Sequence, residues 1–181
     1  MEVKKVQIVS KFYKISFEQF KKDWLDSCPT EKKDWTDKEI MELYNSIQLP
    51  TRATKGSAGY DFKSYFDFSL KQGETIKVPT GIKVEIVEGW WLGILPRSGH
   101  GFKFRAQLDN TVGVIDADYI NSDNEGHIFV KLTNDSKDSS KVLKVEVGTG
   151  FCQGIFIPFG ITFDDNVEAE RNGGFGSTTK K

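Results

Sequence analysis

A carboxylate and an aromatic ring follow directly on a short apolar run in residues 111–119, TVGVIDADY. The β-branched pair at 114–115 favours a strand, and Gly113 lets the backbone come close to a neighbouring group. We interpret this stretch as a tight β-hairpin that buries its apolar residues and holds a nucleotide base, with Asp116 directing a water molecule and Tyr119 packing on a sugar. The alternative is a strand, a turn and a solvated carboxylate, because short motifs often match by chance.

Two further stretches offer groups that bind phosphate. Arg97 can place two N–H donors on phosphate oxygens, and the backbone amides of Ser98 and Gly99 can point at the same anion. Gln153 follows the glycine-containing run 148–152 and can reach a phosphate or an attacking water. The alternatives are an arginine in a surface ion pair and an ordinary turn that enters a strand.

The remaining candidate groups lie near the two ends of the predicted site. Asp61 follows the small residues 57–59 and can hold metal-bound water, although a tight turn explains the same pattern. The glycine-rich arm 171–178 adds the charge of Arg171 and the flat ring of Phe175, although a disordered tail is the usual state of such a composition. Together these stretches supply what a nucleoside triphosphate needs: phosphate donors, a base slot, a ring for the sugar and a carboxylate base.

The composition restricts the class of protein. The chain has 181 residues and a formal net charge of −1, so no long-range field favours nucleic acid or an anionic membrane. Two histidines, and two cysteines without metal-ligand spacing, argue against a zinc site. No run is long and apolar enough for a signal core or a membrane span. We expect a single domain, 1–181, in the cytoplasm, without direct nucleic-acid or membrane partners.

The elements that position these groups are mostly strands. Residues 3–9 resemble a first strand. Capping boxes that begin at Ser16 and Thr36 then predict two short amphipathic helices within residues 12–46, which form a helical insertion. Their apolar faces indicate a cover for the core, and the alternative is a docking surface for a protein partner.

From residue 48 onward the pattern is that of a β protein. Apolar residues alternate with polar ones over short runs, and Gly, Pro, Asp and Asn separate the runs. Many short strands at regular spacing predict a sandwich, a barrel or a jelly roll. The predicted strands cover residues 75–78, 82–86, 90–95, 127–132, 143–147 and 155–159.

In this order and at this spacing, the five stretches resemble the five motifs of the trimeric dUTP pyrophosphatase (dUTPase) family. The resemblance runs from about residue 48 to the C-terminus and includes the typical segment 78–82, VPTGI. It implies a mainly β fold of the jelly-roll, β-clip type, a homotrimer, and active sites built from more than one subunit. It also implies that a flexible arm, 171–181, closes over a neighbouring site.

The resemblance assigns roles to individual residues. Asp116 corresponds to the carboxylate that deprotonates the attacking water, Tyr119 to the ring that excludes a 2′-hydroxyl, and Asp61 to a group that holds Mg²⁺ through water. The other correspondences are uracil reading by Asn110, Val112, Gly113, Val114 and Ile115; phosphate binding by Arg97, Ser98, Gly99 and Gln153; and closure by Arg171, Phe175, Gly176, Ser177 and Thr178. The implied reaction is hydrolysis of dUTP to dUMP and pyrophosphate.

Several positions depart from the family pattern. Gly150 replaces a usual arginine, Cys152 replaces an alanine, and Thr179 replaces a final glycine. After Tyr119, Ile-Asn replaces Arg-Gly and a longer loop, 122–126, follows. The helical insertion has no counterpart in the minimal pattern. All residues to which chemistry is assigned are nevertheless present.

Two other functions compete with this interpretation. A dCTP deaminase or a bifunctional deaminase–dUTPase shares the fold, but it needs a glutamate near the base, and the stretch 111–119 contains none. The chain could instead bind dUTP as a sensor and contact a protein partner through the helical insertion. A viral source would place the protein in the host cytoplasm.

Overall fold

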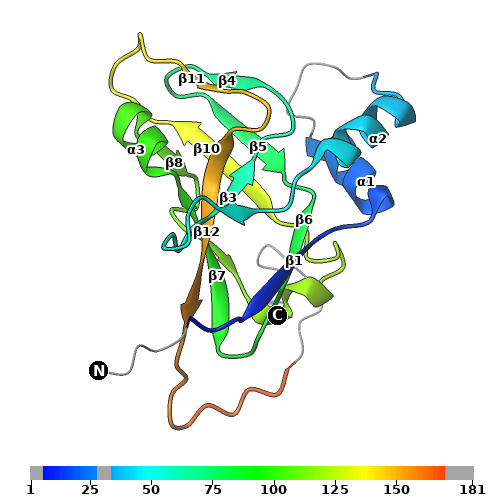
Figure 1. Ribbon diagram of the computed structural model, residues 1–181, viewed down its shortest axis with the longest axis vertical. Coiled ribbons are helices and arrows are strands. Elements are labelled where there is room, and N and C mark those ends of the chain that lie inside the picture. Colours follow the sequence, from blue (N-terminus) through cyan, green and yellow to red (C-terminus); the bar gives the residue numbers. More distant parts are fainter. Residues whose placement is uncertain (1–5, 28–33, 170–181) are drawn as a thin grey trace, which may run out of the picture.

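Short runs of alternating apolar and polar residues form a set of short strands, as the sequence pattern predicts. The computed structural model describes residues 6–27 and 34–169, and Figure 1 shows their arrangement. The helices are α1 (Phe17–Ser27), α2 (Asp37–Ser46), α3 (Ser98–Phe104) and the 3₁₀ helix η1 (Ala117–Asn121). The first strands are β1 (Ser10–Lys14), β2 (Thr51–Arg52), β3 (Tyr60–Lys63), β4 (Phe68–Leu70), β5 (Thr75–Pro79) and β6 (Ile82–Ile86). The others are β7 (Trp90–Pro96), β8 (Ala106–Leu108), β9 (Gly113–Ile115), β10 (Phe129–Asn134), β11 (Leu143–Val145) and β12 (Gly150–Pro158).

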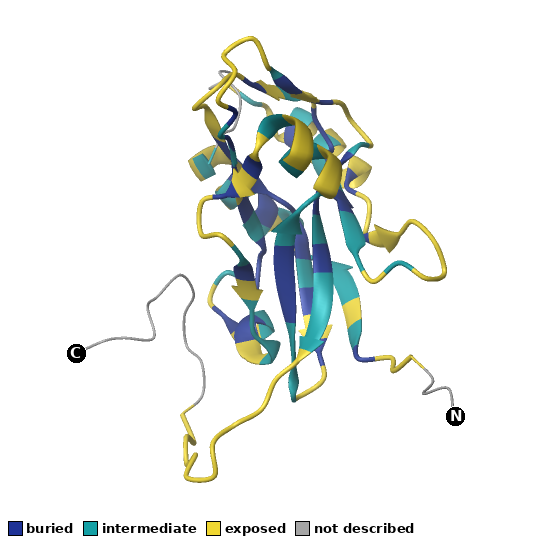
Figure 2. Cartoon of the chain, turned by 90° about the vertical axis from the view of Figure 1, so that its left-hand side faces the viewer, coloured by how far each residue is buried: buried dark blue, intermediate teal, exposed yellow. Residues whose placement is uncertain are grey.

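The strands pair antiparallel throughout the described part of the chain. The largest sheet has five strands in the order β2-β3-β12-β7-β9, and a three-stranded sheet has the order β5-β10-β8. Two strand pairs, β1-β6 and β11-β4, complete the set. Figure 2 shows that buried residues gather along the central strands, whereas α3 is largely exposed. The prediction of a mainly β protein is therefore confirmed.

The first strand lies later in the chain than predicted. Residues 6–9 form no strand, and β1 covers Ser10–Lys14. The ring of Phe12 explains the shift, because it packs against the rings of Tyr60, Phe62 and Phe156. Other boundaries also move: β10 covers 129–134 rather than 127–132, and β12 begins at residue 150 rather than 155. The helical insertion likewise begins at residue 17 rather than 12, since residues 12–14 belong to β1.

The two predicted helices form, and their N-terminal caps differ. At α2 the capping box is complete: Thr36 Oγ1 accepts from the Glu39 amide, and the Glu39 carboxylate accepts from the Thr36 amide. At α1 only half of the predicted box forms, because the Gln19 amide donates to Ser16 Oγ but the Ser16 amide donates to Glu125 at 3.0 Å. A carboxylate from the body of the protein thus completes the cap of α1.

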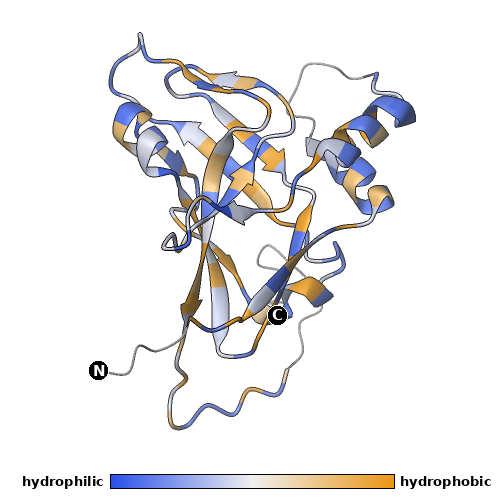
Figure 3. Ribbon diagram, viewed as in Figure 1, coloured by the Kyte–Doolittle hydropathy of each residue, from blue (hydrophilic) through white to orange (hydrophobic). Residues whose placement is uncertain are grey.

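Helices α1 and α2, here called the helical pair, cover the core with their apolar faces. Phe20, Trp24 and Ile40 are fully buried. The ring of Phe20 lies 5.7 Å from that of Tyr65, and Trp24 lies 5.4 Å from Phe66. Figure 3 shows hydrophilic positions alternating with hydrophobic ones along both helices. The interpretation of these helices as a cover is confirmed. In the described residues, no helix is long and apolar enough to cross a membrane.

A polar seam joins α1 to the β body. His127 is fully buried; its Nδ1 lies 2.6 Å from the Asp23 carboxylate, and its Nε2 accepts from the Gly81 amide at 2.8 Å. Because Nε2 accepts, the proton of the neutral ring lies on Nδ1 and is donated to Asp23. The second contact of the seam joins the carboxylate of Glu125 to Ser16.

The seam lowers the pKa values of its titratable groups. Burial lowers the pKa of His127, and this effect outweighs the opposing hydrogen bond and charge of Asp23. Partial burial alone would raise the pKa of Asp23, but its hydrogen bonds with His127 and Gln19 lower it. Partial burial also acts to raise the pKa of Glu125, whereas hydrogen bonds from Ser16 and Lys83 lower it from 4.5 to about 2.

We predict that acid weakens this seam. A folded-state pKa below the unfolded value means that the unfolded chain takes up protons first, so the stability present at neutral pH falls as the pH drops. For His127 the loss begins below its ordinary pKa of 6.5, and for Glu125 it follows between 4.5 and about 2. The midpoint of urea unfolding, at constant chain concentration, should therefore decrease between about pH 7.5 and about pH 5.5. His127→Gln should abolish most of that decrease, and an equal decrease in this variant would assign it to other groups.

Candidate active site

Five of the residues predicted to act on phosphate or metal line one cavity of about 850 Å³. The cavity lies where β3, the end of β7, the start of α3 and β12 meet. These segments are distant in sequence and adjacent in the five-stranded sheet, because β12 pairs with both β3 and β7. The predicted residues that the structure brings together here are Asp61, Arg97, Ser98, Gly99 and Gln153.

Arg97 is held in a defined position at this cavity. Its Nε lies 3.0 Å from the Asp61 carboxylate, and its Nη1 donates to the Gly150 carbonyl at 3.1 Å. The side chain of Arg97 keeps 37% of its surface exposed. The ion pair that was the alternative interpretation does exist, but it orients the guanidinium at the cavity and leaves part of it for an anion. On the neighbouring strand β12, Gln153 Nε2 donates to the Pro96 carbonyl at 3.0 Å.

Gly150 explains one departure from the family pattern. A Cβ atom at this position would meet the Arg97 side chain at 3.2 Å. The absence of a side chain at position 150 therefore makes room for Arg97, whose guanidinium donates to the same residue's carbonyl. An arginine at 150 would need a different position of Arg97.

Sequence reasoning missed three basic or titratable residues at this cavity: His100, Lys103 and Lys144. Burial lowers the pKa of His100, and the charges of Arg97 and Lys103 add to that effect. Lys103 could have been inferred from its place in the helix that begins with Ser98-Gly99. Lys144 lies on β11, and no sequence signal connects it with the site. The extra cations make the cavity suitable for a polyanion.

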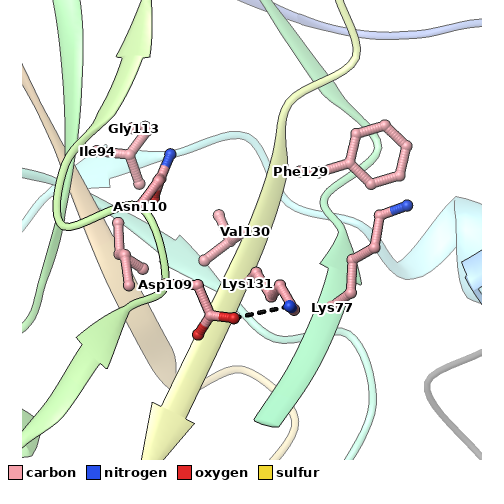
Figure 4. Close-up of a pocket in the computed structure, with 9 residues that line it drawn as sticks. Lys77, Ile94, Asp109, Asn110, Gly113, Phe129, Val130 and Lys131 are labelled. Carbon is pink, nitrogen blue, oxygen red and sulfur yellow. Dashed lines mark ion pairs between the residues drawn. The ribbon is translucent and has the colours of Figure 1, made fainter. Parts of the chain in front are cut away.

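The residues predicted to read the base lie elsewhere. Asn110 and Gly113 line a second cavity, of about 310 Å³, together with apolar side chains that include Ile94 and Leu108 (Figure 4). The volume and the mostly apolar walls suit a planar base, with the Asn110 amide as a polar group at one side. Lys131 and Asp109 form an ion pair of 2.7 Å at the same cavity. The other predicted base readers are Val112, Val114 and Ile115, of which Val114 is 59% exposed and Ile115 is half-buried.

The predicted tight hairpin is wrong in its pairing. Strand β8 pairs with β10, and β9 pairs with β7, so the two arms of the turn belong to different sheets. The turn itself is present: Thr111 has a φ of 66°, and its amide donates to the Leu108 carbonyl. Val114 is also exposed rather than buried, because successive side chains of a strand point to opposite faces and its neighbour Gly113 occupies the buried face.

Asp116 and Tyr119 lie at the start of η1. The Asp116 carbonyl accepts from the Tyr119 amide at 3.1 Å, so the backbone holds the turn. Tyr119 is buried, and its hydroxyl donates to the His127 carbonyl at 2.9 Å. Neither residue lines either of the two cavities.

The geometry of β7 separates Asp116 from the larger cavity within one chain. Ile115, immediately before Asp116, pairs with Leu92, whereas Arg97 follows the far end of β7. Five residues of strand separate positions 92 and 97, which corresponds to roughly 16 Å. The predicted arm residues, 171–178, lie outside the described part of the chain.

The residues at the larger cavity fit a magnesium ion that is held mainly by water and by the phosphates of a bound molecule. Described residues include no group of three or more His, Cys, Asp or Glu side chains that could enclose a metal. Mg²⁺ keeps several waters and commonly binds one or two carboxylates together with substrate phosphates. Asp61 is a carboxylate on the wall of a cationic cavity, so it is suited to hold such an ion through water.

The fold is that of an antiparallel β protein with one cationic cavity and one separate, mostly apolar cavity. This combination suits the class of nucleotide-binding β proteins. The dUTPase family model matches residues 45–179, so the chain belongs to the dUTPase family. The deoxyuridine 5′-triphosphate nucleotidohydrolase of Lactococcus lactis is 40% identical over 145 residues, which are 77% of this chain and 95% of that protein. The enzyme of the same name from Haemophilus influenzae is 37% identical and covers 76% of this chain and 91% of its own.

Solved structures agree with this assignment. A dUTPase from Streptococcus mutans is 37% identical, with a TM-score of 0.55, over 65% of this chain and 90% of its own. A mutant dUTPase from phage phi11 of Staphylococcus aureus, 23% identical, shares the fold with a TM-score of 0.54 over 71% of this chain and 94% of its own. That phage protein is described as coordinating a structural Mg(II) ion. The family match begins near the end of α2, so most of the helical pair precedes it.

Proposed function

We propose that this chain hydrolyses dUTP to dUMP and pyrophosphate by attack of an Asp116-activated water on the α-phosphate, with Mg²⁺ on the phosphates. Membership of the dUTPase family makes it a dUTP diphosphatase. Such a reaction keeps uracil out of DNA and supplies dUMP for thymidylate synthesis. The observation that carries the proposal is the single cavity that gathers Asp61, Arg97, Ser98 and Gln153 from separate segments of the chain.

The phosphate side of the site works by position and charge. Phosphoryl transfer asks a protein mainly to align the reacting atoms and to stabilise the charge of the transition state. Arg97, fixed by Asp61, would offer its remaining N–H donors to the phosphates, and Ser98 and Gly99 line the same cavity at the start of α3, where their amides can add to them. Mg²⁺, held through water by Asp61, would neutralise part of the triphosphate charge.

The nucleoside side selects the base and the sugar. The Asn110 amide and the backbone of 112–115 can pair with the donors and acceptors of uracil, and cytosine presents a different pattern that leaves buried groups unpaired. The ring of Tyr119 packs on deoxyribose and leaves no room for a 2′-hydroxyl. The Asp116 carboxylate, which follows β9 directly, takes the proton of the attacking water.

The site is completed by a second copy of the chain. Asp116 and Arg97 act on neighbouring atoms of one substrate, yet the strand between them keeps them roughly 16 Å apart in one chain. A homotrimer in which Asp116, Asn110 and Tyr119 of one copy face the cationic cavity of the next satisfies both requirements. The glycine-rich arm, with Arg171 and Phe175, would close over the assembled site. Such a trimer suits the cytoplasm, of a host cell if the source is viral.

The sensor interpretation loses its main support. The apolar faces of the helical pair are buried on their own chain, so these faces require no protein partner. The helical pair ends at residue 46, before the residues of the proposed site. Binding of a protein partner to its polar outer face is therefore compatible with catalysis.

Pyrophosphate release with Mg²⁺, measured side by side on dUTP, UTP, dCTP and dTTP, tests the proposal. Turnover of dUTP alone is the expected result. Ammonia release from dCTP would identify a deaminase, and tight binding of dUTP without turnover would identify a sensor. Either of these results would overturn the proposed function.

A further inference from the structure

Residues 122–127 form a loop that touches the proposed catalytic segment on one side. Gly126 has a φ of 71°, and a Cβ atom there would lie 2.6 Å from the Ile120 Cα and 2.9 Å from the Tyr119 carbonyl oxygen. Only a glycine fits this position. The 122–127 loop therefore packs directly on the backbone that carries Tyr119.

The same loop also holds the side chain of Tyr119. The tyrosine hydroxyl donates to the His127 carbonyl at 2.9 Å and accepts from Asn124 Nδ2 at 3.0 Å. Both partners belong to the loop, and Tyr119 is buried. The position of the ring therefore depends on the position of the 122–127 loop.

The opposite side of the loop is bonded to α1. The His127 ring donates to the Asp23 carboxylate at 2.6 Å, and Gln19 Nε2 holds the same carboxylate at 2.8 Å. The Glu125 carboxylate accepts from the Ser16 amide at the start of the helix. These contacts connect positions more than 100 residues apart in sequence, as the separations of 104 and 109 residues show.

Two departures from the family pattern are thus one physical feature. The longer loop after Tyr119 and the helical pair contact each other, and each supplies the hydrogen-bond partners that the other needs. The seam faces charges from other elements as well, since Lys83 on β6 lies 3.0 Å from Glu125. The loop is held between α1 and η1.

We propose that the helical pair positions the sugar-binding tyrosine: Asp23, through His127 and the 122–127 loop, fixes the ring of Tyr119 and thereby sets the preference for dUTP over UTP. Asp23 is a positioning residue, because it touches His127 and not the substrate. This inference rests on the proposed function, which places Tyr119 on the deoxyribose.

The physical reason is the sensitivity of steric selection to small displacements. A ring excludes a 2′-hydroxyl only if it cannot move away by the size of an oxygen atom. A displacement of about 1 Å at a reacting site can cost on the order of 10²-fold in rate. Removal of the Asp23 carboxylate leaves the buried Nδ1 of His127 without its acceptor and the ring held through Nε2 by Gly81, so we expect His127 and its carbonyl, which holds Tyr119, to shift.

The test compares Asp23→Ala with Asp37→Ala. Both substitutions remove a carboxylate of the helical pair, but Asp23 accepts hydrogen bonds from His127 and Gln19, whereas Asp37 forms an ion pair with Lys21 inside the pair. For Asp23→Ala we expect KM for dUTP to rise about tenfold and the dUTP/UTP ratio of kcat/KM to fall about tenfold, with a smaller change in kcat. Asp37→Ala should leave all three values unchanged.

A conservative variant and a second measurement separate positioning from a loss of fold. The side-chain oxygen of Asp23→Asn can still accept from His127, so this variant should recover most of the selectivity. Without nucleotide, hydrogen exchange in residues 117–128 should speed up in Asp23→Ala and not in Asp37→Ala. Equal selectivity in Asp23→Ala and Asp37→Ala, or faster exchange over the whole chain in Asp23→Ala, would overturn the inference. If the unmodified chain did not hydrolyse dUTP, the proposed function would fail, while the exchange result would still report on the coupling.

Discussion

Replacement of Asp116 by asparagine is expected to lower the turnover of dUTP by about 10² to 10⁴-fold, while KM for dUTP stays within a few-fold of its original value. The variant keeps the shape of the side chain and removes its ability to take a proton. The turn should persist, because the Asp116 carbonyl, not its side chain, accepts from the Tyr119 amide. Single-turnover measurements on dUTP would assign the loss to the chemical step.

The control for this prediction is Asp118→Asn. Asp118 lies two residues further on, in the first turn of η1, and is exposed. The same chemical change at this position should leave turnover within a few-fold of the unmodified chain. Near-normal turnover of the Asp116→Asn variant, or equal losses in both variants, would exclude Asp116 as the base.

Residues from separate motifs of the sequence meet at the larger cavity, and their role in phosphate binding stays a prediction. Asp61, Arg97 and Gln153 come from separate stretches, yet they meet because β12 pairs with both β3 and β7. Alternating apolar residues also predicted six strands of the described chain, including β6 without error at 82–86. Periodicity reports which face of a strand is buried, and this local information was sufficient there.

The errors occur where distant contacts outweigh local pattern. The run VKKVQIV is rich in β-branched residues, but β1 starts at Ser10, where Phe12 can pack among three aromatic rings of the sheet. The hairpin around Gly113 failed for the same reason, since β8 and β9 each found partners elsewhere. Strand pairing is set by the whole sheet and not by the turn alone.

The polar seam shows what sequence alone could not give. Gln19 follows Ser16 at the spacing of a capping box, but Glu125 takes its place from 109 residues away. His127 had no motif around it, and its role appears only from its contacts with Asp23 and Gly81. Hydrogen bonds between segments this distant leave no periodic signal in a single sequence.

A mixture of two inactive variants is expected to regain activity, because the site needs residues of different copies. Arg97→Ala should lower turnover by about 10²-fold or more, since it removes the fixed cation at the phosphates. Neither Asp116→Asn nor Arg97→Ala alone can complete a site. In a mixed trimer, however, a site that takes Asp116 from an Arg97→Ala chain and Arg97 from an Asp116→Asn chain contains both residues.

The expected amount follows from symmetry. A cyclic trimer has three sites, each with Asp116 from one copy and Arg97 from the next. In a trimer that contains both variants, an Arg97→Ala chain supplies Asp116 to an Asp116→Asn chain at a single one of these sites, so every mixed trimer has a single complete site. A random equal mixture should therefore recover about a quarter of the activity of the unmodified chain. The same variants mixed after assembly, without exchange of subunits, form no mixed trimers and serve as the control.

A site within one chain predicts a different result, since no chain in the mixture carries both residues and activity would stay at the level of the separate variants. The pairing of Ile115 with Leu92 argues against that outcome, because β7 is a straight run of backbone between Leu92 and Arg97. An arginine side chain cannot span roughly 16 Å of strand to reach a substrate held at Asp116. Recovery of activity in the mixture would therefore establish that the larger cavity of one copy and the Asp116 of another form one active site.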